Sequence, residues 1–178
     1  MARRHDPHRR ERIIEAAVEV ISESGIAALT HRTAAARADV PLGSTTYHFR
    51  SLDELLAAAV HTVAERNVAR LRDWAASLPD NADLSTELAG FIVLLAGEHR
   101  QTSVLAYELY GSALRRPALR AASTAWDEML TEVFESQVDT VTARALTAMF
   151  NGLLYQALVT PGGPERAGVE QVLRRLLR

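Results

Sequence analysis

Hydrophobic residues recur at three- and four-residue intervals along nearly the whole chain, which is the spacing of one helical face. The first such face is made by Ile13, Ile14, Ala17, Val18 and Ile21. The sequence shows no sustained alternation of β-branched and polar residues, which would indicate strands. The good helix formers alanine, leucine, arginine and glutamate dominate instead. The pattern therefore predicts an all-α protein of about nine helices.

Helix caps and helix breakers set the expected boundaries. Asp6 and Pro7 are typical of a helix start, and Gly25 is typical of a helix end. Ser51, followed three residues later by Glu54, forms a capping box that predicts the start of a long fourth helix. The expected helices cover residues 7–24, 31–37, 42–48, 52–76, 84–96, 102–114, a stretch that opens at 117, 140–159 and 165–177.

Residues 26–56 contain two short expected helices separated by a four-residue turn, residues 38–41. Neither short helix can bury much surface alone, so both need the flanking long helices as a platform. Ala34 and Ala35 allow close approach, and Asp39 tolerates the left-handed backbone that such a turn often needs. This arrangement is typical of a helix-turn-helix, in which residues 42–48 would enter the major groove of DNA.

Charge is distributed unevenly, although the net charge is only −2. Residues 1–50 hold 8 basic and 6 acidic side chains and four of the six histidines, and every basic residue of the chain is arginine. This asymmetry alone is weak support for an anionic partner. The chain has no cysteine, and it shows neither a secretory leader nor an apolar run long enough to cross a membrane. We therefore expect a cytoplasmic protein with no membrane partner.

An enzyme built on a helical bundle is the first rival interpretation. The sequence holds no Glu-x-x-His or His-Glu-x-x-His metal pattern, no glycine-rich phosphate loop and no Gly-x-Ser-x-Gly nucleophile turn. Four histidines fall in the N-terminal arm and the helix-turn-helix. The sequence therefore predicts no catalytic residue, no metal site and no cofactor.

Fifteen residues between about positions 10 and 57 form one ungapped pattern: Gly25, Leu29, Thr30, Ala35, Ala38, Asp39, Val40, Gly43, Tyr47, His48, Phe49, Ser51, Asp53, Glu54 and Leu55. In this register the chain resembles the TetR family of helix-turn-helix repressors. Family members usually carry a tyrosine where Thr46 stands and a lysine where Leu52 stands. The resemblance implies that both of those side chains would contact DNA phosphates, so that part of the anchoring must come from other residues here.

The candidate DNA contacts follow from where the residues fall in the motif. Phosphate contacts are expected near the start of the second helix and in the basic arm, and base contacts in the first turn of the third. The candidates are Arg3, Arg4, Thr30, His31, Arg32, Leu42, Gly43, Ser44, Thr45, Tyr47 and His48. Alternatives remain open, because the arginine-rich arm could be a solvated tail and Tyr47 a half-buried structural aromatic.

Two recognition helices about 34–36 Å apart are needed to read a palindrome, so a homodimer is expected. The resemblance implies that the last two helices pair with their mates. The candidate interface is Ala145, Ala148, Met149, Gly152, Gln156, Val169, Val172 and Leu176. The alternative is that these faces pack within the chain.

The resemblance also implies a ligand pocket enclosed by the fourth to seventh helices. The residues that could line it are His61, Asn67, Trp74, His99, Tyr107, Glu108, Tyr110, Trp126 and Tyr155, although residues of these types are more often ordinary core or surface residues than ligand contacts. Such sites are mostly apolar, so a small, largely hydrophobic effector is expected.

Together these expectations describe a repressor with a DNA-binding domain at residues 1–50 and an effector-binding and dimerisation domain at residues 51–178, bridged by the helix from Leu52. Effector would release it from double-stranded operator DNA by favouring a state with the wrong spacing of recognition helices. The second rival is a helical protein-interaction module without operator binding.

Overall fold

The computed structural model describes residues 8–177, and its regular structure within that range consists of nine α-helices and two short 3₁₀ turns. The helices are α1 (Arg9–Ser24), α2 (His31–Arg37), α3 (Leu42–His48), α4 (Leu52–Ala76), α5 (Leu84–Ala96), α6 (Arg100–Ser112), α7 (Arg120–Glu135), α8 (Thr140–Val159) and α9 (Arg166–Leu176). The all-α prediction is confirmed.

Local hydrogen bonds explain the starts of α2 and α4. Thr30 and Thr33 cap α2 reciprocally, because each backbone N–H donates to the other hydroxyl, at 2.8 and 3.0 Å. At the start of α4, the N–H of Glu54 donates to Ser51 Oγ at 3.1 Å, as the capping box predicts. The Glu54 carboxylate, however, accepts from the N–H of Arg50 at 2.8 Å, so the return bond reaches one residue further back.

Several boundaries differ from the sequence prediction. Helix α6 covers Arg100–Ser112 rather than residues 102–114, and α9 covers Arg166–Leu176 rather than residues 165–177. Pro117 opens a 3₁₀ turn, Pro117–Leu119, rather than the seventh helix itself, which begins at Arg120. That turn is closed by a 2.9 Å bond from the N–H of Leu119 to the carbonyl of Arg116. The predicted cap at Asp6 and Pro7 lies outside the described residues.

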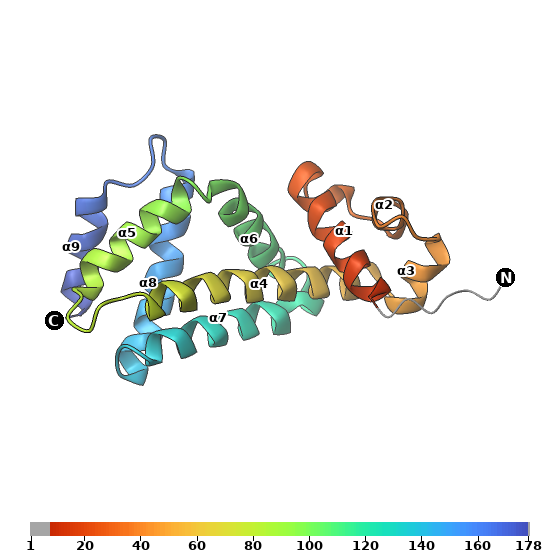
Figure 1. Ribbon diagram of the computed structural model, residues 1–178. Helices are drawn as coiled ribbons and strands as arrows, with labels where there is room; N and C mark the ends of the chain where they lie inside the picture. The colour runs from red at the N-terminus through yellow and green to blue at the C-terminus, as the bar shows by residue number, and fades with distance from the viewer. Residues whose placement is uncertain (1–7, 178) are drawn as a thin grey trace. The chain divides into compact units, whose positions relative to one another are not determined.

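The chain divides into two compact units. The first runs to Val63 and includes Glu108–Ser123, and the second consists of Ala64–Tyr107 and the chain from Thr124 onward. In the first unit, α1 packs on α2 and α3, as the red-to-orange ribbon of Figure 1 shows. Its core includes Ile13, Ile21 and Phe49, each at most 1% exposed. Burying each of these side chains stabilises the unit by roughly 1.5–3 kcal/mol.

An ion-pair cluster on the surface of the first unit joins α1 to α2. The Arg37 guanidinium donates to Glu23 with both terminal nitrogens, and one of them also reaches Glu19 at 3.2 Å. These bonds raise the pKa of Arg37, and the bond from Arg37 lowers the pKa of Glu23. Arg37 therefore holds the end of α2 against two successive turns of α1.

In the second unit, α5 packs against α8 and α9 (Figure 1), in keeping with its nearly all-apolar sequence. Aromatic rings from four helices form a chain through this core. Trp74 stacks on Phe91 with ring centroids 5.0 Å apart, Phe91 lies 6.4 Å from Phe150, and Phe150 lies 5.9 Å from Phe134. These contacts connect α4, α5, α8 and α7 across the interior.

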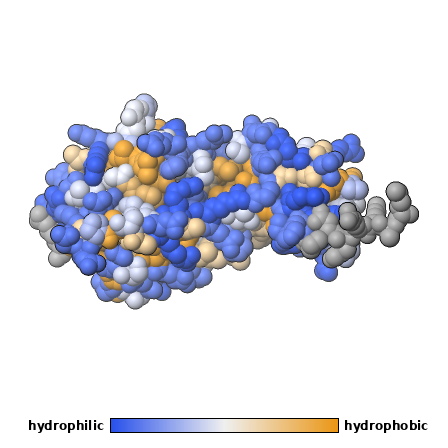
Figure 2. Space-filling view, in the orientation of Figure 1, coloured by the Kyte–Doolittle hydropathy of each residue, from blue (hydrophilic) through white to orange (hydrophobic). Residues whose placement is uncertain are grey.

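Hydrophilic residues cover most of the face drawn in Figure 2, and hydrophobic residues emerge in separate patches. The large hydrophobic side chains that are most exposed are Leu42, Tyr47, Leu114, Val141, Tyr155, Val159 and Val172. Among residues 8–177, no helix has the length and hydropathy needed to cross a bilayer.

Candidate nucleic-acid interface and ligand cavity

The turn between α2 and α3 depends on one residue with a left-handed backbone. Asp39 has φ 52°, and no other non-glycine residue in the described part of the chain has a positive φ. The N–H of Val40 donates to the carbonyl of Ala35 at 3.0 Å, which closes the turn. Ala34 and Ala35 are buried beneath it. The small residues and the aspartate therefore act as the sequence predicts.

Helix α3 divides sharply into an outer and an inner face. Tyr47 is 83% exposed and Leu42 is 45% exposed, and Gly43 also faces solvent. Phe49, at the end of the helix, is fully buried. Since Tyr47 is this exposed, a half-buried structural role for its ring is excluded.

The structure corrects the prediction that Thr45 contacts DNA. Its side chain is 0% exposed, and its hydroxyl donates to the carbonyl of Leu42 at 2.8 Å. A group covered on all sides cannot reach a base or a phosphate while the unit stays folded. Thr45 therefore anchors α3 from below, and Ser44 and His48 lie half-buried at the edge of the outer face.

The start of α2 presents a second polar surface. Thr30 and Arg32 are exposed, whereas His31 is half-buried. The Nδ1 atom of His31 is buried and has no hydrogen-bond partner among the described residues. Arg32 is therefore open to an anion beside the first N–H groups of α2, whereas the Thr30 hydroxyl already caps the helix and His31 is less accessible.

The basic arm is only partly described. Arg3 and Arg4 lie outside the described residues. The guanidinium of Arg10 lies 5.1 Å from the centroid of the Phe49 ring, a cation–π contact that holds this cation beside the end of α3. Arg10 belongs to the basic arm that the sequence predicts, but its contact with Phe49 was not predicted, because that contact depends on how α1 crosses α3.

A small enclosed cavity of about 30 Å³ lies within the second unit. Its walls come from α4, α5, α6, α7 and α8 and are mostly apolar. The lining residues are Asn67, Arg70, Leu71, Phe91, Leu95, Ser103, Ala106, Tyr107, Trp126, Leu130, Phe150, Asn151 and Leu154. The volume is enough for one or two water molecules, so a larger ligand requires side chains to move.

Polar groups of the cavity wall bond mainly to one another. A terminal nitrogen of Arg70 donates to Asn67 Oδ1 at 3.1 Å. The Tyr107 hydroxyl donates to the carbonyl of Asn151 at 3.2 Å, and Nδ2 of Asn151 donates to an oxygen of Asp127 at 3.1 Å. These bonds connect α6, α7 and α8 around the cavity.

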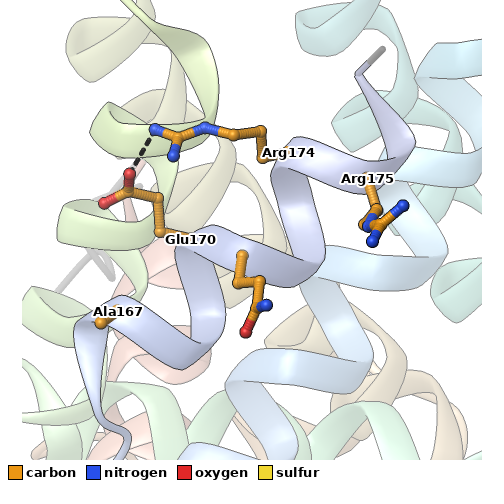
Figure 3. A pocket seen from close by; sticks show the side chains of 5 residues that line it. Ala167, Glu170, Arg174 and Arg175 are labelled. Atoms are coloured by element: carbon orange, nitrogen blue, oxygen red, sulfur yellow. Dashed lines mark hydrogen bonds and ion pairs between the residues drawn. The ribbon is translucent and has the colours of Figure 1, made fainter.

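A second hollow, about 370 Å³ in volume, lies on the surface of α9. Its lining comes from that helix alone and includes Glu170, Gln171 and Arg175. Figure 3 shows Arg174 paired with Glu170, while Arg175 points to the other side of the helix. An open, polar hollow along one helix lacks the enclosing walls of a small-molecule site.

Both parts of the chain match known protein families. Residues 13–59 match the model of bacterial regulatory proteins of the tetR family, and residues 79–178 match the tetracyclin repressor-like C-terminal domain. The chain belongs to the TetR family. It is a helix-turn-helix transcription regulator, as the resemblance implied. Among curated proteins, none matches the chain.

Solved structures of other TetR-family proteins extend this similarity over the whole fold. The multidrug binding protein EbrR complexed with imidazole is 46% identical, covers 96% of each chain and has a TM-score of 0.87. EbrR complexed with ethidium is 45% identical over 97% of this chain and 99% of that one, with a TM-score of 0.86. The putative transcriptional regulator SCO7518 from Streptomyces coelicolor A3(2) is 34% identical over 96% and 98%, with a TM-score of 0.89.

In this TetR-family chain, only part of the predicted pocket set reaches the cavity. Asn67, Tyr107 and Trp126 line it. Trp74 stacks behind the lining residue Phe91, and the ring of Tyr155 meets the ring of Tyr107 at 5.8 Å. The remaining candidates do not line the cavity, and those are His61, His99, Glu108 and Tyr110. His61, Glu108 and Tyr110 belong to the first unit.

Sequence reasoning missed several lining residues, above all Arg70, Phe150 and Asn151. One signal was available for Arg70, because it stands three residues after Asn67 on the same helical face. Phe150 and Asn151 gave no comparable signal, since the sequence does not show that α8 reaches the cavity.

The predicted dimer residues of this family member are mostly open to solvent. Ala148, Gly152, Gln156 and Val172 are exposed, and Ala145, Met149 and Leu176 are partly buried. The prediction that Val169 lies in the dimer interface is wrong, because this side chain is 7% exposed and packs within its own chain. Exposed Val141, Tyr155 and Val159 lie on the same face of α8 as Ala148 and Gly152 and were missed.

Proposed function

We propose that the chain is a dimeric, ligand-responsive repressor that a small, largely hydrophobic effector releases from a palindromic operator. Residues 1–50 would read DNA, and residues 51–178 would bind effector and form the dimer. The observation that carries the proposal is the outer face of α3, where Leu42, Gly43 and Tyr47 are exposed while Thr45 and Phe49 are buried. A helix anchored on one side and bare on the other is suited to entering a major groove.

The exposed groups divide the DNA contacts between them. Leu42, Gly43 and Ser44 would meet base edges, where a side chain can touch a thymine methyl and glycine allows close approach. Phosphates would be held by Tyr47 and His48 on one side, and on the other by the start of α2. There Thr30 and Arg32 are exposed, and His31 would contribute less because it is half-buried.

A homodimer would pair the exposed face of α8 with its mate. Ala148 and Gly152 allow two helices to approach closely, and Val141, Tyr155 and Val159 extend the same face with exposed apolar surface. Apolar surface of this kind on terminal helices is favourable only when a partner covers it. Two recognition helices would then be held about 34–36 Å apart.

The effector would occupy the enclosed cavity of the second unit. Its aromatic wall suits a flat apolar molecule, and the relative EbrR was solved with ethidium, proflavin and malachite green. Since the cavity holds only about 30 Å³, effector binding requires the wall to open. The effector releases DNA only if it binds the opened state more tightly than the state that fits the operator.

The test is binding of the full chain to DNA from its own upstream region at about 50 and 200 mM salt, beside random DNA. An Arg32→Ala and Tyr47→Ala double variant should lose affinity, whereas Arg72→Ala, an exposed arginine of the second unit, should not. Tight, salt-sensitive binding that the double variant lacks supports the proposal. A folded dimer without preference for the upstream DNA favours the protein-interaction module instead.

A further inference from the structure

The cavity has one charged side chain in its lining, and that charge is positive. Arg70 stands on α4 among eight apolar lining residues, and the other polar lining groups are the neutral Asn67, Ser103, Tyr107 and Asn151. The guanidinium of an arginine stays protonated at any physiological pH. A ligand in this cavity therefore meets a fixed positive charge.

The bonds around the cavity leave this charge unbalanced. The one polar contact of the Arg70 guanidinium within the described chain is the amide oxygen of Asn67, at 3.1 Å, and no carboxylate oxygen of residues 8–177 lies within ion-pairing distance. A guanidinium has five N–H donors, and a neutral amide oxygen uses one of them. Arg70 is half-buried, and none of its nitrogens is among the buried polar atoms without a partner, so solvent meets the remaining donors until a ligand replaces it.

The neighbouring acidic group does not serve Arg70. Asp127 accepts from Nδ2 of Asn151 at 3.1 Å, and it is not part of the cavity lining. Ser103 donates its hydroxyl to the carbonyl of Leu95 at 2.9 Å. The other polar groups are thus occupied with each other, and the guanidinium is the group with capacity for a ligand.

The aromatic residues of the cavity lining suit a flat ligand. The rings of Phe91 and Phe150 are inclined by only 19° with centroids 6.4 Å apart, and both line the cavity together with Trp126. Aromatic side chains favour flat apolar ligands through stacking and edge contacts. A cavity with apolar walls and a single arginine without an acidic partner suits a ligand that is an amphipathic anion.

We propose that the effector of this protein is an aromatic carboxylate, whose ring lies against Phe91, Trp126 and Phe150 and whose carboxylate binds Arg70 in a bidentate pair. The inference rests on the proposed function, because it takes the cavity to be the effector site. It separates this chain from EbrR in the charge of the ligand, since the ethidium and proflavin of the EbrR structures are aromatic cations.

Three probes with one ring system and different charges test the proposal: 2-naphthoate, 2-naphthamide and 2-naphthylmethylammonium. Each is titrated calorimetrically into the full-length protein. The carboxylate should bind about 10- to 100-fold more tightly than the amide, which is the strength of hydrogen bonds to a charged group, and the ammonium should bind weakest. Equal or tighter binding of the ammonium, or binding of none of the three, overturns the proposal.

Variants of Arg70 assign the preference to that side chain. Arg70→Gln should reduce the ratio of carboxylate to amide affinity to about one, and Arg70→Glu should favour the ammonium. Asn67→Ala should keep the carboxylate preference, because it removes only the competing amide. Arg72→Gln, two residues along the same helix and paired with Glu132, is the matched control and should change nothing. Retention of the preference in a folded Arg70→Gln protein contradicts the proposal.

DNA release separates this inference from the function on which it rests. If 2-naphthamide releases the protein from DNA as well as 2-naphthoate does, and Arg70→Gln responds to both in the same way, the charge assignment fails and the repressor proposal stands. If naphthoate binds through Arg70 without affecting DNA affinity, the assignment stands and the effector role of the cavity fails.

Discussion

Thr45→Val is the substitution that most directly separates a buried support from a DNA contact on α3. The side chain is fully buried, and its hydroxyl donates to the carbonyl of Leu42 at 2.8 Å. Valine keeps the shape of the side chain but removes that hydrogen bond, which has a net cost of about 0.5–1.5 kcal/mol. Part of this cost is offset, because the methyl group that replaces the hydroxyl is better suited to the core. We expect the free energy of unfolding to fall by about 1 kcal/mol or less.

DNA affinity should stay nearly constant in Thr45→Val, because the outer face of α3 is unaltered. If the hydroxyl instead donated to a phosphate, its loss would remove about 1.5–3 kcal/mol of binding, roughly a 10- to 150-fold loss of affinity. Urea unfolding and fluorescence anisotropy on the same preparations distinguish the two cases. Thr46→Val is the matched control, because it makes the same substitution at the neighbouring residue, whose side chain is exposed rather than buried. A tenfold loss of affinity in Thr45→Val at unchanged stability would refute the reasoning.

Four further predictions address the turn, an ion pair, a helix cap and the dimer. Asp39→Gly should raise the free energy of unfolding by about 0.5 kcal/mol, since glycine adopts φ 52° without strain. A lower free energy of unfolding in a urea titration would contradict this. Asp53→Arg breaks a 2.7 Å ion pair with Arg116 in the first unit and should lower the free energy of unfolding by roughly 0.5–1 kcal/mol in a urea titration. The double variant Asp53→Arg with Arg116→Asp reverses the pair and should recover most of that loss. Asp139 accepts hydrogen bonds from the hydroxyl and the N–H of Thr142, which lower its pKa, so its contribution to stability is present above about pH 4 and is lost as the pH falls through the lowered pKa. The melting temperature of Asp139→Asn should therefore fall less between pH 4 and pH 2 than that of the unaltered protein. Ala148→Arg on the exposed face of α8 should yield monomers in analytical ultracentrifugation, and a persistent dimer would place the interface elsewhere.

Short-range chemistry determined the elements themselves. The predicted spans of α2, α3, α4, α5 and α8 coincide with the structure, and α2, α5 and α8 each begin at a residue whose side chain caps its own backbone. Asp83 and Asp139 each accept from two N–H groups at the start of a helix, and the Thr30 hydroxyl accepts from the N–H of Thr33 at the start of α2. The left-handed Asp39 was likewise predictable, since few residue types tolerate that conformation.

The orientation of side chains in short helices was beyond the sequence. Helix α3 has seven residues, barely two turns, so its hydrophobic spacing does not define a buried face. Thr45 and Ser44 look equivalent in the sequence, yet one is fully buried and the other half-buried. Packing against α1 and α2 decides between them, and that packing involves contacts distant along the chain.

The sequence by itself determined the helical fold, the helix-turn-helix and its register, because caps, turns and periodicity are local properties of the chain. The tertiary structure alone decided that Val169 is covered and that Val141 and Tyr155 are bare. It also decided that Arg70 and Asn151, 81 positions apart, line one cavity. The physical reason is that burial and convergence depend on which helices pack together, and amphipathic helices can satisfy their own periodicity in many packing arrangements.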